Sequence, residues 1–175
     1  MIKVKSMTID TLMDCYDPIT IEGYCKQCPK YESYWSCPSF SFDTEAWLRS
    51  YKYFSVIVAS TKTTHHDDTM MMFDTFRESF RNGLMTLESK FNGYSLYAGS
   101  CLLCKTCTRE KGEFCRYPDE MRYSLEALGI SVSHLIASSV GEKLTWGKDG
   151  TLKTVMGFLS NEVISEEEIV RIMEA

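Results

Sequence analysis

The sequence predicts an α/β or α+β fold, in which a single domain of residues 1–175 carries a mixed β-sheet covered by helices. Apolar, β-branched runs typical of buried strands alternate with segments whose apolar residues recur at helical spacing. Strands separated by helices and by long crossovers favour a sheet with helices packed on it, in two or three layers. A chain of 175 residues can bury a real core, and no repeat or linker divides it.

The N-terminal half is predicted to contain two strands and three helices. Residues 2–4 are expected as an edge strand, residues 9–15 as a short helix that packs Cys15 inward, and residues 43–50 as a helix capped by Asp43 or Thr44. Residues 53–59 form a continuous apolar run and read as a buried strand. A long helix should begin at Asp67 or Asp68 and end at Asn92-Gly93, because an apolar stripe recurs along it at helical spacing: Met72, Phe73, Phe76, Phe80, Leu84, Leu87 and Phe91.

Strands and helices are also predicted to alternate in the C-terminal half. Residues 94–98 are predicted as a strand that leads into a cysteine-rich loop, and Pro118 should open a helix that Gly129 ends. Ser131 can cap a further helix, residues 148–150 form a turn before a strand at 154–159, and a capping box at Ser165 opens the last helix.

Seven of the eight cysteines fall into two tight groups: Cys25, Cys28 and Cys37, then Cys101, Cys104, Cys107 and Cys115. The second group has the spacing C-x2-C-x2-C-x7-C, which brings several thiolates to one small object and is typical of iron-sulfur cubanes. The first, C-x2-C-P-x7-C-P, supplies three more soft ligands, and zinc also accepts C-x2-C turns. We therefore predict that all seven cysteines bind metal.

Disulfides and inert buried thiols are the alternatives to metal binding. The first residues run quickly into polar positions such as Thr8 and Asp10, without the apolar segment of a secretory signal, so we expect a cytoplasmic protein. Thiols stay reduced in that compartment, and clustered cysteines there are more often metal ligands or catalytic groups. The spacing and the compartment together favour metal binding.

Composition argues against several classes of function. A net charge of -5 disfavours a nucleic-acid partner, which needs a concentrated basic surface. No apolar run is long enough for a membrane span. The glycine-rich dinucleotide and phosphate motifs are absent, and so is the C-x3-C-x2-C spacing of radical S-adenosylmethionine enzymes.

Basic and aromatic side chains gather around the cysteines. The cations can stabilise thiolates, and the aromatic residues can shield a cluster from water. The cations are Lys26, Lys30, Lys105, Arg109, Lys111 and Arg116; the aromatic residues are Tyr24, Tyr31, Tyr34, Trp35, Phe40, Phe42, Trp47, Phe114 and Tyr117. Solvated loop charges and ordinary core packing are the simpler explanations for single members of these sets.

Three motifs together resemble the domain-of-unknown-function 2284 family of predicted metal-binding proteins, found mainly in anaerobes. They are Cys25-x2-Cys28-Pro29 with Tyr34-Trp35-Ser36-Cys37-Pro38; Gly99-Ser100-Cys101-x2-Cys104-x2-Cys107; and Cys115-Arg116-x-Pro118 continuing through Met121 to Ser124-Leu125-Glu126-Ala127-Leu128-Gly129-Ile130. The resemblance extends over about residues 25–159 and implies metal binding through seven cysteines, with no established reaction. Cys15 lies outside the pattern, and we expect it to be a buried thiol.

An odd number of ligands has a chemical consequence. One complete tetrathiolate site leaves three thiolates for the other, and a cubane with three thiolates exposes one iron to a substrate or a non-cysteine ligand. Cys15 could instead close that site, and His65 or His66 could supply a nitrogen, although paired histidines in a polar loop are more often solvated. His134, on a predicted helix, is expected to be structural.

The favoured function is a cytoplasmic iron-sulfur protein with one or two [4Fe-4S] clusters that exchanges electrons with a redox partner protein. One alternative is a zinc-stabilised binding module, although zinc sites usually pair two separated C-x2-C turns. Another is an enzyme that acts at an open iron near residues 25–37, but no general base or other catalytic residue stands out there. The sequence does not predict an oligomeric state.

Overall fold

The computed structural model describes residues 1–63, 69–145, 147 and 149–175. The strands are β1 (Ile2–Thr8), β2 (Tyr53–Lys62), β3 (Tyr94–Leu96) and β4 (Thr151–Ser160). The helices are α1 (Ile9–Met13), α2 (Pro18–Cys25), α3 (Thr44–Arg49), α4 (Thr69–Glu78), α5 (Arg81–Phe91), α6 (Val132–Val140) and α7 (Glu166–Met173), with the 3-10 turns η1 (Thr108–Lys111) and η2 (Glu126–Leu128). No helix of the described part is both long and apolar enough to cross a membrane.

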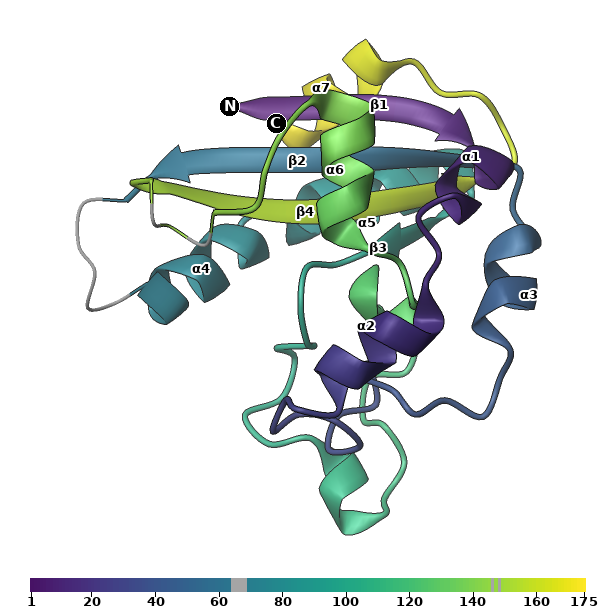
Figure 1. Cartoon of the computed structure of the whole chain (residues 1–175), viewed down its shortest axis with the longest axis vertical. Coiled ribbons are helices and arrows are strands. Elements are labelled where there is room, and N and C mark those ends of the chain that lie inside the picture. Colours follow the sequence, from purple (N-terminus) through teal and green to yellow (C-terminus); the bar gives the residue numbers. More distant parts are fainter. Residues whose placement is uncertain (64–68, 146, 148) are drawn as a thin grey trace.

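The four strands form one sheet in the order β1-β2-β4-β3 (Figure 1). Each of the three strand pairings found in the described residues is antiparallel. The fold is therefore α+β, one of the two predicted alternatives, while the expectation of a mixed sheet is wrong. The helices do not act as crossovers between parallel strands, because each neighbouring pair of strands in the sheet runs in opposite directions.

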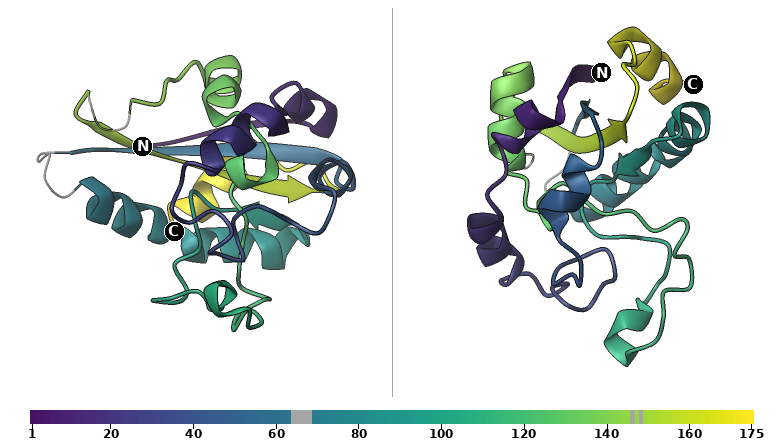
Figure 2. Two further views of the ribbon diagram at one scale, coloured as in Figure 1. Left: turned by 60° about the horizontal axis from the view of Figure 1, so that its bottom comes forward. Right: turned by 90° about the vertical axis from the view of Figure 1, so that its right-hand side faces the viewer.

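Helices cover both faces of the sheet and create two cores (Figures 1 and 2). On one face, Phe54 and Val56 of β2 pack with residues of α1, α3, α6 and the segment around η2. On the other face, Ile57 of β2 and Phe158 of β4 pack with α4, α5 and α7. Burial on both faces explains why the sequence of β2 is continuously apolar instead of alternating.

The predicted long helix is broken into two, α4 and α5. The hydroxyl of Ser79 donates to the carbonyl of Phe76 at 2.7 Å, and this kind of local bond competes with the helical ladder. The predicted starting residues, Asp67 and Asp68, lie outside the described residues. The apolar stripe belongs to the core as predicted, with Leu84 and Leu87 buried.

The predicted helix after Pro118 is also wrong, because only η2 forms there. Tertiary contacts hold this segment in a more extended path: the N–H of Tyr97 donates to the carbonyl of Tyr123 at 2.8 Å, and the guanidinium of Arg122 is held by α5. Such contacts override helix propensity. Gly129, predicted as the end, does terminate η2 with a φ of 89°.

Helix α2 was not predicted, although its start carries a recognisable signal. Asp17 caps it by accepting a bond from the N–H of Thr20 at 3.2 Å, and Pro18 occupies the first turn. The other predicted strands and helices are confirmed with shifted ends, although Ser131 begins α6 without a side-chain capping bond. Lys148 of the predicted turn lies outside the described residues. Asp43 caps α3, Gly141 follows α6, and Ser165 caps α7.

The two cysteine-rich segments lie together beyond the β3 edge of the sheet, at the bottom of Figure 1 (Figures 1 and 2). The first follows α2, and the second leaves β3 and returns through η1 toward η2. The long gap between them in sequence is therefore closed in space.

Candidate metal centre

The four cysteines of the second group surround one cavity. Cys101, Cys104, Cys107 and Cys115 all line a cavity of about 20 Å³. Tyr34, Trp35 and Ser36 of the first cysteine-rich segment line the same cavity, as do Leu103, Thr108, Tyr117 and Met121. The spacing thus brings these thiols to a common space, and the first segment forms part of its wall.

A buried arginine fixes the start of the second segment. Arg77 of α4 is only 5% exposed, and its guanidinium donates to the carbonyls of Ala98 at 2.5 Å and Ser100 at 2.7 Å. Its Nε also donates to Asp74 at 2.9 Å. Gly99, between the two carbonyls, has a φ of 67°, which favours glycine. Sequence reasoning missed Arg77, although its position directly after Phe76 of the predicted apolar stripe was a usable signal.

Two of the sulfurs accept backbone hydrogen bonds. The N–H of Leu103 points at Sγ of Cys101 and that of Trp35 at Sγ of Cys107, each with an N-to-S distance of 3.5 Å. Such donors favour the thiolate over the thiol, and at iron-sulfur sites they influence the reduction potential. The second bond comes from the other cysteine-rich segment.

The first group of cysteines is also brought together. Cys25 is the last residue of α2, and Cys28 and Cys37 follow in the adjoining loop. Burial is the main reason that the pKa of Cys37 is raised to about 11. A hydrogen bond with the Ser36 hydroxyl opposes this rise, and the negative charges of Cys28 and Cys25 add to it. Burial is likewise the main reason that the pKa of Cys25 is raised. The three thiols form one electrostatically coupled group that a bound cation would stabilise as thiolates.

Arg109 of η1 ties the two segments together. Its guanidinium donates to the carbonyls of Tyr34 at 2.8 Å, Cys37 at 2.6 Å and Ser39 at 2.7 Å. The same group lies over the ring of Trp35, 5.4 Å from its centroid. The predicted role of Arg109 as a cation beside thiolates is therefore replaced by a clamp on backbone carbonyls.

Further bonds join the segments at three places. The N–H of Cys101 donates to the buried Ser36 hydroxyl at 2.9 Å, and the indole N–H of Trp35 donates to the carbonyl of Glu113 at 3.1 Å. Lys30 donates to the Ser100 hydroxyl at 2.8 Å. The two cysteine groups therefore belong to one structural unit.

An ion pair anchors this unit to the helical layer. Arg122 makes two bonds to the carboxylate of Glu88 on α5, at 2.7 and 2.6 Å. Its side chain is 8% exposed and that of Glu88 is 12% exposed. The Arg122 guanidinium also donates to the carbonyls of Asp119 at 2.7 Å and Met121 at 2.9 Å, just after Cys115. The end of the second segment, like its start, is thus held by a buried arginine.

Only some of the predicted cations act on the thiols. The charge of Lys30 favours the thiolate of Cys37, while Lys26 pairs with Glu22 at 3.4 Å. Lys105, Lys111 and Arg116 are exposed. Burial raises the pKa of Cys101, and the charge of Arg81, which sequence reasoning missed, opposes that rise.

The predicted aromatic shield is only partly confirmed. Tyr34 and Trp35 line the cysteine cavity, but Phe114 is 94% exposed and Tyr24 is 65% exposed. Phe40, Phe42 and Trp47 pack in a ring cluster with Tyr123 and Tyr94 beneath the loops. These three residues therefore build the core that supports the site.

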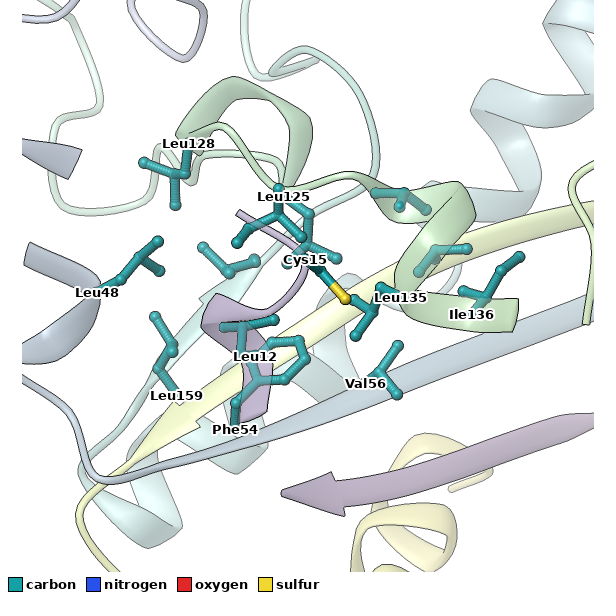
Figure 3. Close-up of a cluster of buried hydrophobic side chains, with 14 of the residues drawn as sticks. Leu12, Cys15, Leu48, Phe54, Val56, Leu125, Leu128, Leu135, Ile136 and Leu159 are labelled. Carbon is teal, nitrogen blue, oxygen red and sulfur yellow. The ribbon is translucent and has the colours of Figure 1, made fainter. Parts of the chain in front are cut away.

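Cys15 lies in the hydrophobic core, in a cluster that contains none of the other seven cysteines (Figure 3). Cys15 is 4% exposed in the same cluster as Leu12, Leu125 and Leu135, and burial raises the pKa of its thiol. The expectation of a buried thiol is confirmed. His134 is exposed on α6, and His65 and His66 lie outside the described residues.

The donor types fit a soft metal or an iron-sulfur cluster, since seven thiols are held in two neighbouring groups. Among the residues that the structure describes, no three Cys, His, Asp or Glu side chains already stand in an arrangement that could hold a metal ion. The assignment of the seven cysteines as ligands stays a prediction.

Comparison with known proteins agrees with the donor chemistry. The model of a family described as predicted metal-binding protein (DUF2284) matches residues 19–159, which include both cysteine groups, Arg77, Arg109 and Arg122. No curated protein and no solved structure matched the chain significantly. The match covers most of the chain, and the protein therefore belongs to the DUF2284 family of predicted metal-binding proteins.

Proposed function

We propose that this protein is an iron-sulfur protein of the cytoplasm that carries a [4Fe-4S] cluster on Cys101, Cys104, Cys107 and Cys115. The observation that carries the proposal is that these four thiols line one cavity. Their C-x2-C-x2-C-x7-C spacing suits a cubane better than zinc, which usually takes two separated C-x2-C turns. Rotation of the thiol side chains from their present positions would accompany binding.

The surroundings of the four thiols support a cluster in two ways. Backbone N–H groups point at the sulfurs of Cys101 and Cys107, as expected where negative charge resides on sulfur. Arg77, Arg109 and Arg122 fix the backbone on either side of the cavity. Such outer contacts orient ligands before the metal binds.

A role in electron transfer is supported by the position of the site. Phe114 and Tyr117, which flank Cys115, are 94% and 44% exposed. Charges of both signs are exposed on the same loop, including Lys111, Glu113 and Arg116. Exposed aromatic side chains beside Cys115 are a reasonable docking surface for a redox partner, and the short path from Cys115 to the surface favours electron exchange.

The first cysteine group is proposed as a second site, which would hold the second of the two predicted clusters. Cys25, Cys28 and Cys37 are coupled to one another but bring only three thiols. Arg109 and Ser36 connect this group to the other, so that two clusters would lie within one structural unit.

Anaerobic purification, followed by iron and sulfide analysis, visible absorption and electron paramagnetic resonance of the reduced protein, tests the proposal. We expect a brown protein that contains iron and sulfide, and loss of most of the C-terminal cluster signal in C104S. C15A is the matched control, since it also removes one cysteine but from the core. A colourless protein that holds zinc would replace this proposal with the zinc-stabilised module.

A further inference from the structure

A second cavity adjoins the one that the four C-terminal cysteines surround. Its volume is about 370 Å³, toward the small end of the range for small-molecule sites. Trp35, Cys115 and Met121 line both cavities, so these residues form the wall between them. A molecule bound in the second cavity would therefore lie beside one of the four thiols.

Aromatic rings form much of the wall of this second cavity, which we call the aromatic cavity. Phe40, Phe42, Phe114 and Tyr123 line it together with Trp35. The rings of Phe40 and Phe42 stack with centroids 5.1 Å apart, and Tyr123 packs against both. Phe114 is 94% exposed and the other four are only partly buried, so ring surface stays uncovered. Uncovered rings around a cavity favour a planar aromatic molecule that can stack on them.

The charge of the aromatic cavity comes from one cation. Among the described residues that line it, Arg109 is the only lysine, arginine, aspartate or glutamate. Its bonds to carbonyls use two N–H groups of Nη1 and one of Nη2, out of five on the guanidinium. Arg109 takes part in none of the ion pairs formed by the described residues. An unpaired cation in the wall complements an anion, although the net charge of the protein is -5.

We propose that the aromatic cavity binds a small planar aromatic anion, such as an aromatic carboxylate or sulfonate. Its ring would stack on the aromatic side chains, and Arg109 would complement its charge. The anion would lie beside Cys115, so its effect on a cluster rests on the proposed function. Reduction adds negative charge to a cluster, and a neighbouring anion opposes this. The bound anion should therefore lower the reduction potential, and the reduced protein should bind the anion more weakly.

Naphthalene-2-sulfonate is the probe, titrated by calorimetry into the full chain after anaerobic reconstitution with iron and sulfide. We expect saturable binding. Naphthalene-2-sulfonamide has the same rings without the charge and should bind at least about tenfold more weakly, because it loses a charge-assisted bond. Cyclohexanesulfonate keeps the charge without the planar ring and should also bind more weakly. Equal affinities for the three molecules, or no binding of naphthalene-2-sulfonate, would overturn the inference.

Two exposed aromatic residues supply matched variants. Phe114 is 94% exposed and lines the aromatic cavity, whereas Tyr24 is 65% exposed and does not line it. We expect F114A to weaken binding of naphthalene-2-sulfonate about three- to tenfold, and Y24A to leave it unchanged. Both variants should keep the iron content and the melting temperature of wild type. Wild-type affinity in F114A would overturn the inference, as would an equal loss of affinity in Y24A.

The redox state gives a measurement that a cavity unconnected with the cluster would not change. Naphthalene-2-sulfonate should bind the dithionite-reduced protein more weakly than the oxidised protein, and it should lower the reduction potential by a matching amount. Equal affinities in the two states would overturn the link between cavity and cluster. A protein that takes up no iron would overturn the proposed function and this link, whereas selective binding of naphthalene-2-sulfonate by that protein would still support the aromatic cavity as a site.

Discussion

The backbone N–H of Cys101 donates to the hydroxyl of Ser36 at 2.9 Å, and Ser36 is only 1% exposed. This bond joins the first residue of one cysteine group to the residue just before Cys37, the last of the other. The two groups are 65 residues apart along the chain at this point and still share one wall. A change in the backbone at one cysteine group can therefore be transmitted to the other group through this hydrogen bond.

Replacement of Arg109 by alanine should loosen the first cysteine segment. Three carbonyls would lose their charged donor, and we expect the free energy of unfolding to fall by about 1–3 kcal/mol. Urea unfolding of the metal-free protein measures this, and iron content should fall as well. R109K is the matched variant: it keeps the charge but not the planar fork, so it should recover only part of the loss. Equal stability of R109A and wild type would contradict the clamp.

Removal of one partner of the Arg122–Glu88 pair should strongly lower the free energy of unfolding, because the other charge stays buried. We expect R122A to lose about 3–5 kcal/mol of unfolding free energy. The double variant E88L/R122M replaces both charges by apolar groups and should lose less than R122A alone. Together with the single variants E88L and R122M, the double variant completes a double-mutant cycle in urea that measures the coupling. Additive losses would show that the pair contributes nothing of its own.

Cys15→Ala should leave the iron and sulfide content unchanged, since its thiol lies in the core rather than in either group. The small loss of packing should lower the free energy of unfolding by about 1 kcal/mol. Metal analysis and urea unfolding are done on the same preparation. Cys37→Ala is the contrasting variant, and loss of iron in C15A comparable to that in C37A would make Cys15 a ligand.

Tyr97→Phe should stabilise the protein. The hydroxyl of Tyr97 is buried and has no hydrogen-bond partner among the described residues, so its removal should raise the unfolding free energy by about 1 kcal/mol at neutral pH. Y97L is the control, because it also removes the ring that lies 5.0 Å from the guanidinium of Arg81. It should destabilise.

The same residue predicts a pH dependence. Burial raises the pKa of Tyr97 to about 12, above the unfolded value of about 10. The unfolded chain therefore ionises first, and stability should be lost as the pH rises from about 10 to 12. The unfolding free energy of Y97F should fall less steeply over this range, because its unfolding releases about one proton fewer than the unfolding of wild type. Parallel curves for wild type and Y97F would show that another group causes the loss.

Much of the fold was predictable because its signals are local. The apolar run that became β2, the caps Asp43 and Ser165, and the buried position of Cys15 all follow from periodicity and end signals. The break between α4 and α5 was not predictable from the apolar stripe, which continues across it. The extended path at Arg122 was not predictable either, since a long-range bond to Glu88 holds it.

For the site, the sequence by itself determined which donors are available: seven thiols in two spaced groups, with one further cysteine outside them. Only the tertiary structure decided how they are arranged. It brought the hydroxyl of Ser36 to the backbone N–H of Cys101, and it brought Arg109 to the carbonyls of Tyr34, Cys37 and Ser39. The physical reason is that the cysteine spacing determines only which thiols lie near one another along the local chain. The contacts between the two groups depend on how antiparallel strands and packed helices bring segments together that are distant in sequence.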